Sequence, residues 1–469
     1  MSRTKKILIN VVLLGHIDHG KTKLAEKLSQ KISTAGLDKH PEAQRRGISI
    51  DIGFTAFELN EYLITLVDAP GHADLIRNVV AASSIADAAI LVIAADEGSM
   101  IQTGEHIVIL DSFKIHNVLI ALNKIDLIKE TEIPKRIDQI RNLLKTTSFP
   151  NAPIIPISAK NGNGIEELKK SLYSILSPPQ RHIDGPLKMP IDHAFPIKGT
   201  GTVITGTIHR GTVSVGDKIE IMPLKIIAKI RGIQIFQEPI QIARAGDRVG
   251  LSIPGMDYRK ISRGFYACSP NSLKLTHHLI IEGRINSLFK RIIKPGIRVH
   301  VTVGMPTVSA IIYPFKIENS KSILMEKVSS NEDFYAYLKL DKMISTEKGE
   351  NILISRLELP PTTLRIVGNG KVIDPNPKDM EINKVSIRKG SVRYIKNQED
   401  RVIRYVIDNL SKSKFGAEKL INKEIYSESG KIGRILSPFG TKGAVIGKFD
   451  QIPSKNQMVF LKKYKKVKL

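Results

Sequence analysis

The stretch Gly15-His16-Ile17-Asp18-His19-Gly20-Lys21-Thr22 decides the fold of the first part of the chain. It fits the pattern G-x-x-x-x-G-K-[ST] of a phosphate-binding loop, in which backbone N–H groups and a helix N-terminus face an anion. An apolar run of strand length, residues 7–14, precedes it, and residues 23–28 read as a helix start. Strand, loop and helix are the context that this motif needs, so a chance glycine-rich turn is the weaker interpretation.

This loop predicts a nucleotide site with named roles. Lys21 is expected to reach the β- and γ-phosphates, and the Thr22 hydroxyl to hold Mg²⁺. The flanking residues of the same loop complete the predicted nucleotide contacts: Asp18, His19, Gly20 and Lys23.

A second motif follows an apolar strand pattern and ends in Asp68-Ala69-Pro70-Gly71-His72. Asp68 is expected to bind Mg²⁺ through water, since Mg²⁺ keeps much of its hydration shell. Gly71 can bring its backbone N–H against the γ-phosphate, and His72 would then project towards the attacking water. The alternative for His72 is an exposed side chain without a role.

Residues 34–53 lack a clear period, and a polar loop of this length is usually mobile or functional. Ser49 in this loop offers a hydroxyl that is expected to close on Mg²⁺ when a γ-phosphate is present. A plain surface loop is the alternative.

Two segments are expected to recognise the base of the nucleotide: Asn123-Lys124-Ile125-Asp126 and Ser158-Ala159-Lys160. The Asp126 carboxylate can accept from N1–H and the 2-amino group of guanine, a pattern that adenine lacks, so the motif selects GTP over ATP. The Lys124 stem can cover the base plane, and the backbone of residues 158–160 can contact guanine O6. All these motifs follow strand patterns in one order, as ligand sites do in doubly wound sheets, which predicts an α/β domain over residues 1–180.

Length and composition limit the number of domains and the environment in which the protein can work. At 469 residues the chain is expected to form two to four domains. The single cysteine, Cys268, excludes an intramolecular disulfide and any cysteine-cluster zinc site, which favours a reducing, cytoplasmic setting. No apolar run reaches the roughly 18 residues of a membrane span, so we expect no membrane partner.

The net charge of +25 is unevenly spread, because residues 381–469 carry 21 Lys and Arg against 8 Asp and Glu. This imbalance favours a polyanionic partner, most often nucleic acid. General solubility, or adaptation to a cell's ionic interior, is the alternative.

After residue 185 the pattern changes from alternating strands and helices to short strands with glycine turns, which indicates β-barrels. We expect barrel domains at residues 186–270 and 271–375, and a basic, β-rich domain at residues 381–469. The predicted fold class is therefore an α/β P-loop GTPase domain followed by three β-barrel domains.

The motifs Asp-Ala-Pro-Gly-His and Arg45-Arg46-Gly47-Ile48-Ser49-Ile50 resemble the switch regions of translational GTPases of the elongation-factor Tu superfamily. That family usually has threonine at the Ser49 position. The resemblance implies GTP and GDP as ligands, a GTPase activity in which the ribosome places His72 against water, and switches that are released on hydrolysis.

Residues 191–199 and 245–250 resemble the second domain of the selenocysteine-specific elongation factors of archaea and eukaryotes, and residues 300–308 and 356–365 resemble their third domain. The resemblance implies that Asp192, His193 and Arg248 line an aminoacyl pocket. A selenol is an anion at neutral pH and a serine hydroxyl is not, so two charge-assisted hydrogen bonds would give about 10²–10⁴-fold discrimination. The alternative is a barrel ion pair beside a packed histidine.

The resemblance further implies selenocysteinyl-tRNA and the ribosome as partners of a monomer that acts at recoded UGA codons. Residues 381–469 would serve that tRNA, the mRNA recoding hairpin, or a protein that binds the hairpin. Two other hypotheses stay open at this point. One is an initiator-tRNA-binding or general elongation factor, and the other is an RNA-binding regulator that uses GTP only as a switch.

Overall fold

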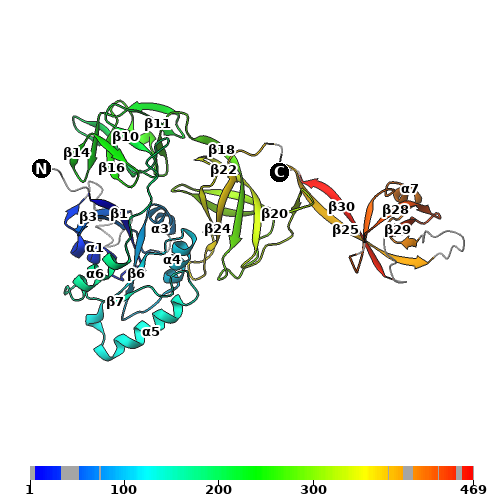
Figure 1. Cartoon of the computed structure of the whole chain (residues 1–469), viewed down its shortest axis with the longest axis horizontal. Coiled ribbons are helices and arrows are strands. Elements are labelled where there is room, and N and C mark those ends of the chain that lie inside the picture. The colour runs from blue at the N-terminus through cyan, green and yellow to red at the C-terminus, as the bar shows by residue number, and fades with distance from the viewer. Residues whose placement is uncertain are drawn as a thin grey trace. The chain divides into compact units, whose positions relative to one another are not determined.

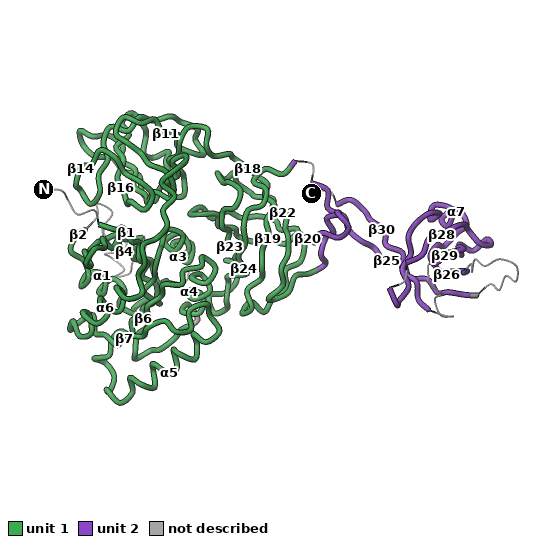
Figure 2. The backbone as a smooth tube through the Cα atoms, in the orientation of Figure 1, with its two compact units in different colours: residues 1–314, 327–377 green, residues 315–326, 378–469 purple. Residues whose placement is uncertain are grey.

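The computed structural model describes residues 6–32, 52–72, 75–378, 380–394, 405–430, 432–449 and 457–467. The chain forms two compact units: residues 1–314 with 327–377, and residues 315–326 with 378–469 (Figure 2). The second unit thus includes residues 315–326, which the sequence pattern predicts to lie within the second barrel. Ser49 lies outside the described residues. None of the described helices is both long and apolar enough to span a membrane.

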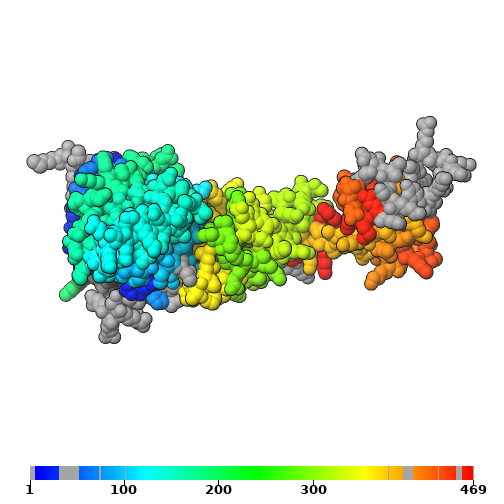
Figure 3. Space-filling view, turned by 90° about the horizontal axis from the view of Figure 1, so that it is seen from below, coloured from blue at the N-terminus to red at the C-terminus, as the bar shows by residue number. Residues whose placement is uncertain are grey.

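The first unit begins with an α/β domain built on one sheet of order β2-β3-β4-β1-β5-β6-β7 (Figure 1). Strands β4, β1, β5, β6 and β7 run parallel, and β3 is antiparallel to β4. Its strands are β1 (Ile7–Leu14), β2 (Lys31–Ile32), β3 (Gly53–Leu59), β4 (Tyr62–Asp68), β5 (Ala88–Ala94), β6 (Val118–Asn123) and β7 (Ile154–Pro156). Its α-helices are α1 (Lys21–Leu28), α3 (Ile76–Ser83), α4 (Ile101–Ser112), α5 (Ile133–Leu144) and α6 (Ile165–Ile175). Figure 3 shows one face of this domain, coloured blue to teal.

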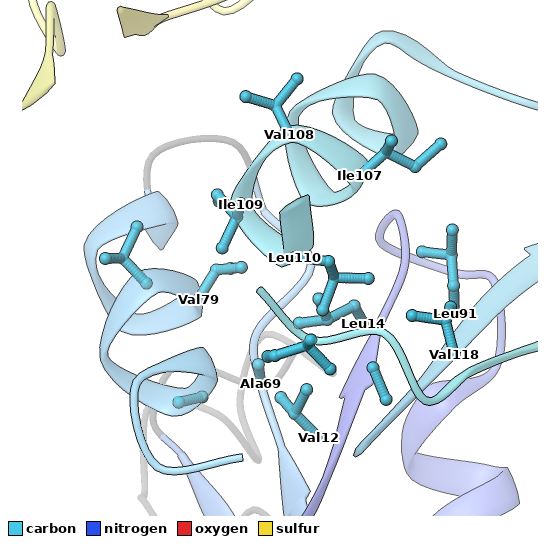
Figure 4. Close-up of a cluster of buried hydrophobic side chains, with 14 of the residues drawn as sticks. Val12, Leu14, Ala69, Val79, Leu91, Ile107, Val108, Ile109, Leu110 and Val118 are labelled. Carbon is cyan, nitrogen blue, oxygen red and sulfur yellow. The ribbon is translucent and has the colours of Figure 1, made fainter. Parts of the chain in front are cut away.

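Both faces of this sheet are buried, because side chains alternate along each strand. Val12 and Leu14 of β1 join the cluster that includes side chains of α3 and α4, such as Val79 and Leu110 (Figure 4). The intervening Leu13 packs in the other cluster, which includes side chains of α1 and α6. Parallel strands buried on both faces read as continuous apolar runs, which is why residues 7–14 show no polar alternation.

The first barrel follows, with an eight-stranded sheet of order β12-β11-β17-β8-β9-β16-β13-β14 and a separate pair β10-β15. The strands are β8 (Lys188–Ile197), β9 (Gly201–Thr207), β10 (Thr212–Ser214), β11 (Lys218–Met222), β12 (Ile226–Lys229), β13 (Gly232–Ile235), β14 (Glu238–Ile240), β15 (Ile242–Arg244), β16 (Arg248–Ser252) and β17 (Tyr266–Cys268).

The second barrel is a ring of six strands in the order β19-β23-β24-β18-β22-β20, which pairing of β19 with β20 closes. These strands are β18 (Lys274–Ile285), β19 (Ile297–Val303), β20 (Thr307–Glu318), β22 (Asp333–Thr346), β23 (Asn351–Ser355) and β24 (Ile366–Asp374). Closure leaves no free sheet edge within the ring.

The second unit has a core of its own, formed by side chains such as Tyr405, Ile407 and Leu461. Its longest strands pair antiparallel, from Ile382 opposite Val467 to Ser391 opposite Met458. The elements are β21 (Lys321–Leu324), β25 (Ile382–Tyr394), β26 (Tyr405–Asp408), α7 (Lys414–Glu418), β27 (Glu424–Ser427), β28 (Ile432–Phe439), β29 (Ala444–Phe449) and β30 (Met458–Val467).

A buried ion pair joins the α/β domain to the second barrel. Arg365, just before β24, donates from Nη2 to Glu105 Oε2 of α4 at 2.6 Å and from Nε to Oε1 at 3.0 Å. The Arg365 backbone N–H donates to the same carboxylate, and both side chains are at most 3% exposed. The polar groups of this contact are therefore paired inside an apolar surrounding.

We expect Arg365→Ala to lower the free energy of unfolding of the first unit by about 3–5 kcal/mol, because it leaves the Glu105 charge buried and uncompensated. Chemical denaturation followed by circular dichroism measures the change. Arg298→Ala is the matched control, since its ion pair with Asp341 is exposed and such pairs contribute about 0–1 kcal/mol. Equal effects of the two substitutions would contradict the expectation.

Candidate nucleotide and aminoacyl sites

The phosphate-binding loop joins β1 to α1 and is held by its own lysine. Lys21 Nζ donates to the carbonyl oxygens of Gly15, at 2.9 Å, and His16, at 2.8 Å. A Cβ added to Gly15 would lie 2.3 Å from the Val92 carbonyl oxygen of β5. Glycine is therefore required where the loop passes the neighbouring strand, and the ammonium group is held over the loop that the sequence assigns to phosphates.

The end of β4 meets this loop. Leu13 lies opposite Asp68 in the parallel pairing of β1 with β4, and Thr22 Oγ1 donates to Asp68 Oδ2 at 2.9 Å. A hydroxyl and a carboxylate side by side are the hard oxygen donors that Mg²⁺ prefers, so the residues fit this ion.

The turn after Asp68 closes on the loop. A Cβ on Gly71 would lie 2.3 Å from Lys21 Nζ and 2.6 Å from the Ile17 backbone nitrogen, so only glycine allows this approach. His72 follows directly and is half-buried. The structure thus brings together the loop, Asp68 and Gly71, as the sequence predicts, whereas Ser49 lies outside the described residues.

Asn123, at the end of β6, connects the two halves of the nucleotide site. Its Nδ2 donates to the His19 carbonyl oxygen at 2.8 Å, and its Oδ1 accepts from the Ala159 backbone N–H at 2.9 Å. A Cβ on Gly20 would lie 2.4 Å from Asn123 Nδ2. One buried amide therefore fixes the phosphate-binding loop against the loop after β7.

The remaining predicted nucleotide residues surround this amide. Ser158 and Ala159 are buried, and the backbone N–H of Ser158 donates to the Asn163 carbonyl oxygen at 3.0 Å. Lys124 is half-buried with its Nζ 3.7 Å from Glu97 Oε1. The other predicted contacts have exposed side chains: Asp18, Lys23, Asp126 and Lys160.

Asp192 is the centre of a buried polar cluster in the first barrel. Arg248 Nη1 donates to its Oδ2 at 2.5 Å, Thr205 Oγ1 donates to its Oδ1 at 2.5 Å, and His193 Nδ1 lies 2.9 Å from Oδ1. Burial alone would raise the pKa of the Asp192 carboxyl, but Arg248 and His193 hold that pKa well below its usual range. The carboxylate is therefore ionised and fixes the guanidinium.

Arg248 also contacts the α/β domain. Its Cζ lies 3.2 Å from the ring centroid of Phe54 in β3, and the His193 ring meets the same phenyl ring edge-on, with centroids 6.4 Å apart. Arg263 Nη1 donates to Asn78 Oδ1 of α3 at 3.2 Å and its Nε donates to the Asp192 carbonyl oxygen. Phe54, Asn78 and Arg263 carry no local sequence signal, because their partners lie far away in the chain.

Arg248 lines a hollow at the surface of the first barrel. The other residues that line it are Phe195, Ile197, Val203, Thr205, Gln234, Phe236, Gln237, Val249 and Gly250. The buried Arg248 Nε–H has no hydrogen-bond partner among the described residues. His193 lies on the Phe54 side of Asp192 and does not line this hollow. Of the three predicted pocket residues, the structure places all three in one cluster but only Arg248 at the hollow.

Three family patterns match this chain. "Elongation factor Tu GTP binding domain" matches residues 6–178, "Elongation factor Tu domain 2" matches residues 201–268, and "Archaeal selenocysteine-specific elongation factor, domain III" matches residues 273–376. The selenocysteine-specific elongation factor of Methanocaldococcus jannaschii is 44% identical over 467 residues, which is 98% of each chain. The chain belongs to the selenocysteine-specific elongation factors.

Further relatives agree with this family. The mouse selenocysteine-specific elongation factor is 39% identical over 65% of this chain and 56% of its own. The crystal structure of translation elongation factor SelB from Methanococcus maripaludis, in complex with the GTP analogue GppNHp, is 40% identical, covers 99% of this chain and 100% of its own, and gives a TM-score of 0.85. The apo form of the same factor is 41% identical, covers 98% of this chain and 99% of its own, and gives a TM-score of 0.80.

These comparisons confirm the predicted fold class, a GTPase domain of the elongation-factor Tu type followed by β-barrel domains. They also confirm that the chain is a GTPase with GTP and GDP as ligands, and a translation elongation factor. Both alternatives, an initiator-tRNA-binding or general elongation factor and an RNA-binding regulator that uses GTP only as a switch, are thereby set aside.

Proposed function

We propose that this chain, with GTP bound, carries selenocysteinyl-tRNA to the ribosome at recoded UGA codons and releases it after hydrolysis. The observation that carries the selenium assignment is the buried Arg248 guanidinium, which lines a hollow and whose Nε–H meets no hydrogen-bond acceptor in the part of the chain that the structure describes. A buried donor without a partner costs about 1–3 kcal/mol, so an anionic ligand atom that accepts from it would recover this cost. A selenolate is such an atom, and a neutral serine hydroxyl is a weaker one.

Nucleotide binding would use the two loops that Asn123 connects. Lys21 would neutralise the β- and γ-phosphates, with Asp18, His19, Gly20 and Lys23 contributing the loop around them. Thr22 and Asp68 would hold Mg²⁺, with Ser49 as a further ligand, and the ion would neutralise charge on the transferring phosphoryl group. Gly71 would present its N–H to the γ-phosphate, and His72 would orient and polarise the attacking water.

We expect Asp126→Asn to weaken GTP binding by at least about 100-fold and to favour xanthosine triphosphate instead, because an amide can donate to the xanthine 2-oxo group. Displacement of a fluorescent nucleotide measures both affinities. Asp138→Asn, at an exposed position of α5, is the matched control. An unchanged preference for GTP would show that Asp126 does not read the base.

Communication between the nucleotide and the aminoacyl end would pass through Phe54. Phe54 is the second residue of β3 and lies two positions after the buried Ile52. In sequence it directly follows residues 34–53, the predicted loop that contains Ser49. The Phe54 ring contacts Arg248 and His193. A rearrangement of that loop on loss of the γ-phosphate would move the ring relative to Arg248. Affinity for the aminoacyl end would then depend on which nucleotide is bound.

The second unit would bind the selenocysteine tRNA, the mRNA recoding hairpin, or a protein that binds this hairpin. Lys321 Nζ lies 4.6 Å from the centroid of the Tyr464 ring, and Lys462 Nζ lies 5.4 Å from that of Tyr426. Burial, together with the nearby positive charges of Arg388 and Lys423, lowers the pKa of the Lys463 ammonium. Side chains of this kind favour binding of single-stranded nucleic acid, because the cations attract the phosphate backbone and the aromatic rings stack on accessible bases.

Phosphate release on programmed ribosomes tests the proposed function. Fast release is expected only when a UGA codon with its recoding hairpin and selenocysteinyl-tRNA are both present. Release that is equally fast with seryl-tRNA at the same codon, or without any aminoacyl-tRNA, would contradict the proposal.

A further inference from the structure

Two histidines of the phosphate-binding loop converge on a carboxylate that lies beyond the end of β5. His19 Nε2 lies 3.5 Å and His16 Nδ1 lies 4.0 Å from Glu97 Oε2. The three ligand atoms are all within 4.8 Å of one another. The other oxygen, Oε1, faces Lys124 Nζ at 3.7 Å, so one oxygen of Glu97 is oriented towards the two imidazoles.

The imidazole of His19 is prepared as an acceptor. Its Nδ1 lies 3.1 Å from the Val92 carbonyl oxygen, which can only accept, so Nδ1 carries the hydrogen and donates. In the neutral ring this leaves the lone pair on Nε2. The His19 side chain is fully buried, and its Nε2 has no hydrogen-bond partner among the described residues. Burial also lowers the pKa of His19, which keeps the ring neutral.

His16 supplies a second imidazole nitrogen, which can act as an acceptor in the tautomer that carries its hydrogen on Nε2. Its Nδ1 is buried and has no hydrogen-bond partner in the described part of the chain. Two unpartnered imidazole nitrogens beside a carboxylate are costly unless something accepts their lone pairs, and a proton can satisfy only one of them at a time. A backbone carbonyl that orients a ligand histidine is a common feature of protein metal sites.

From this arrangement we propose that His16, His19 and Glu97 bind a transition-metal dication such as Zn²⁺. Two imidazoles and a carboxylate form a three-ligand set that leaves one tetrahedral position open. Neighbouring ligand atoms on such an ion lie roughly 3.3 Å apart at metal–ligand distances of about 2.0–2.2 Å. His16 and Glu97 are partly exposed, at 19% and 35% of their side chains, so rotation of these two closes the remaining gap. Nitrogen ligands favour Zn²⁺ over Mg²⁺, which separates this site from the magnesium site at Thr22 and Asp68.

Titration of the full-length, tag-free chain with Co²⁺ and Zn²⁺ tests the proposal. The expected result is visible Co²⁺ absorption of a low-symmetry, four- or five-coordinate site, saturating at about one equivalent per chain, and its loss when Zn²⁺ displaces Co²⁺. Glu97→Gln and His16→Asn are expected to weaken Zn²⁺ binding by at least about tenfold. The matched control is His277→Asn, in the second barrel, which should bind like the unaltered chain.

Circular dichroism of each variant verifies that it is folded. If His16→Asn unfolds, Glu97→Gln still decides the test, because it replaces only one oxygen atom of a partly exposed side chain. The absence of a Co²⁺ spectrum, or Zn²⁺ binding that is unchanged in Glu97→Gln, would overturn the proposal. Either outcome would mean that the two histidines and Glu97 form a polar contact that binds no metal.

Discussion

His72→Ala is expected to slow ribosome-stimulated GTP hydrolysis by about 10²–10⁴-fold, the usual contribution of a positioned general acid–base group. The reason is the place of His72 in the chain, directly after Gly71, whose backbone lies against Lys21 and the phosphate-binding loop. Phosphate release on programmed ribosomes, in single turnover, measures the effect.

The same variant should bind GTP as the unaltered chain does, because the predicted phosphate and base contacts are intact. His116→Ala, at an exposed position before β6, is the matched control and should hydrolyse GTP normally. If His72→Ala hydrolyses GTP on the ribosome at the rate of the control, the catalytic role of this histidine is excluded.

Arg248→Ala is expected to abolish the preference for selenocysteinyl-tRNA over the same tRNA carrying serine, a loss of about 10²–10⁴-fold in discrimination. The substitution removes the buried guanidinium, with its Nε–H, from the hollow. Protection of the ester bond from spontaneous hydrolysis, measured for both aminoacyl-tRNAs with GTP present, reports the two affinities.

Arg248→Ala also leaves Asp192 uncompensated, so Arg248→Lys is a necessary companion. Lysine keeps a positive charge near Asp192 but has no Nε–H at that place, and it should lose most of the discrimination while the barrel stays folded. Arg259→Ala, whose side chain is 75% exposed in the same barrel, is the control. Discrimination that survives in Arg248→Lys and Arg248→Ala alike would place the selenium-sensing group elsewhere.

The α/β domain could be predicted from sequence because its signals are local. Gly15, Gly20 and Gly71 stand where a Cβ would collide with neighbouring backbone or side chains, and the motifs around them have fixed spacing. The apolar runs of β1 and β5 follow directly from burial on both faces. In such a domain the residue types, their spacing and the strand order point to the same arrangement.

The polar cluster around Asp192 could be predicted only in part, because its contacts join distant segments. Arg248 lies 56 residues from Asp192, and Phe54 and Asn78 come from another domain. The family resemblance identified the ion pair and His193, but no sequence pattern indicates that Phe54 covers Arg248, or that Arg248 Nε finds no hydrogen-bond partner among the described residues. Likewise, nothing local indicates that residues 315–326 belong to the second compact unit.

The most direct measurement of the central claim is the identity of the aminoacyl-tRNA that copurifies with the GTP-loaded chain from cells that make selenoproteins. The account predicts selenocysteinyl-tRNA, retained with GTP and lost after exchange for GDP. Recovery of a mixture of elongator aminoacyl-tRNAs, or of seryl- and selenocysteinyl-tRNA in proportion to their abundance, would contradict it.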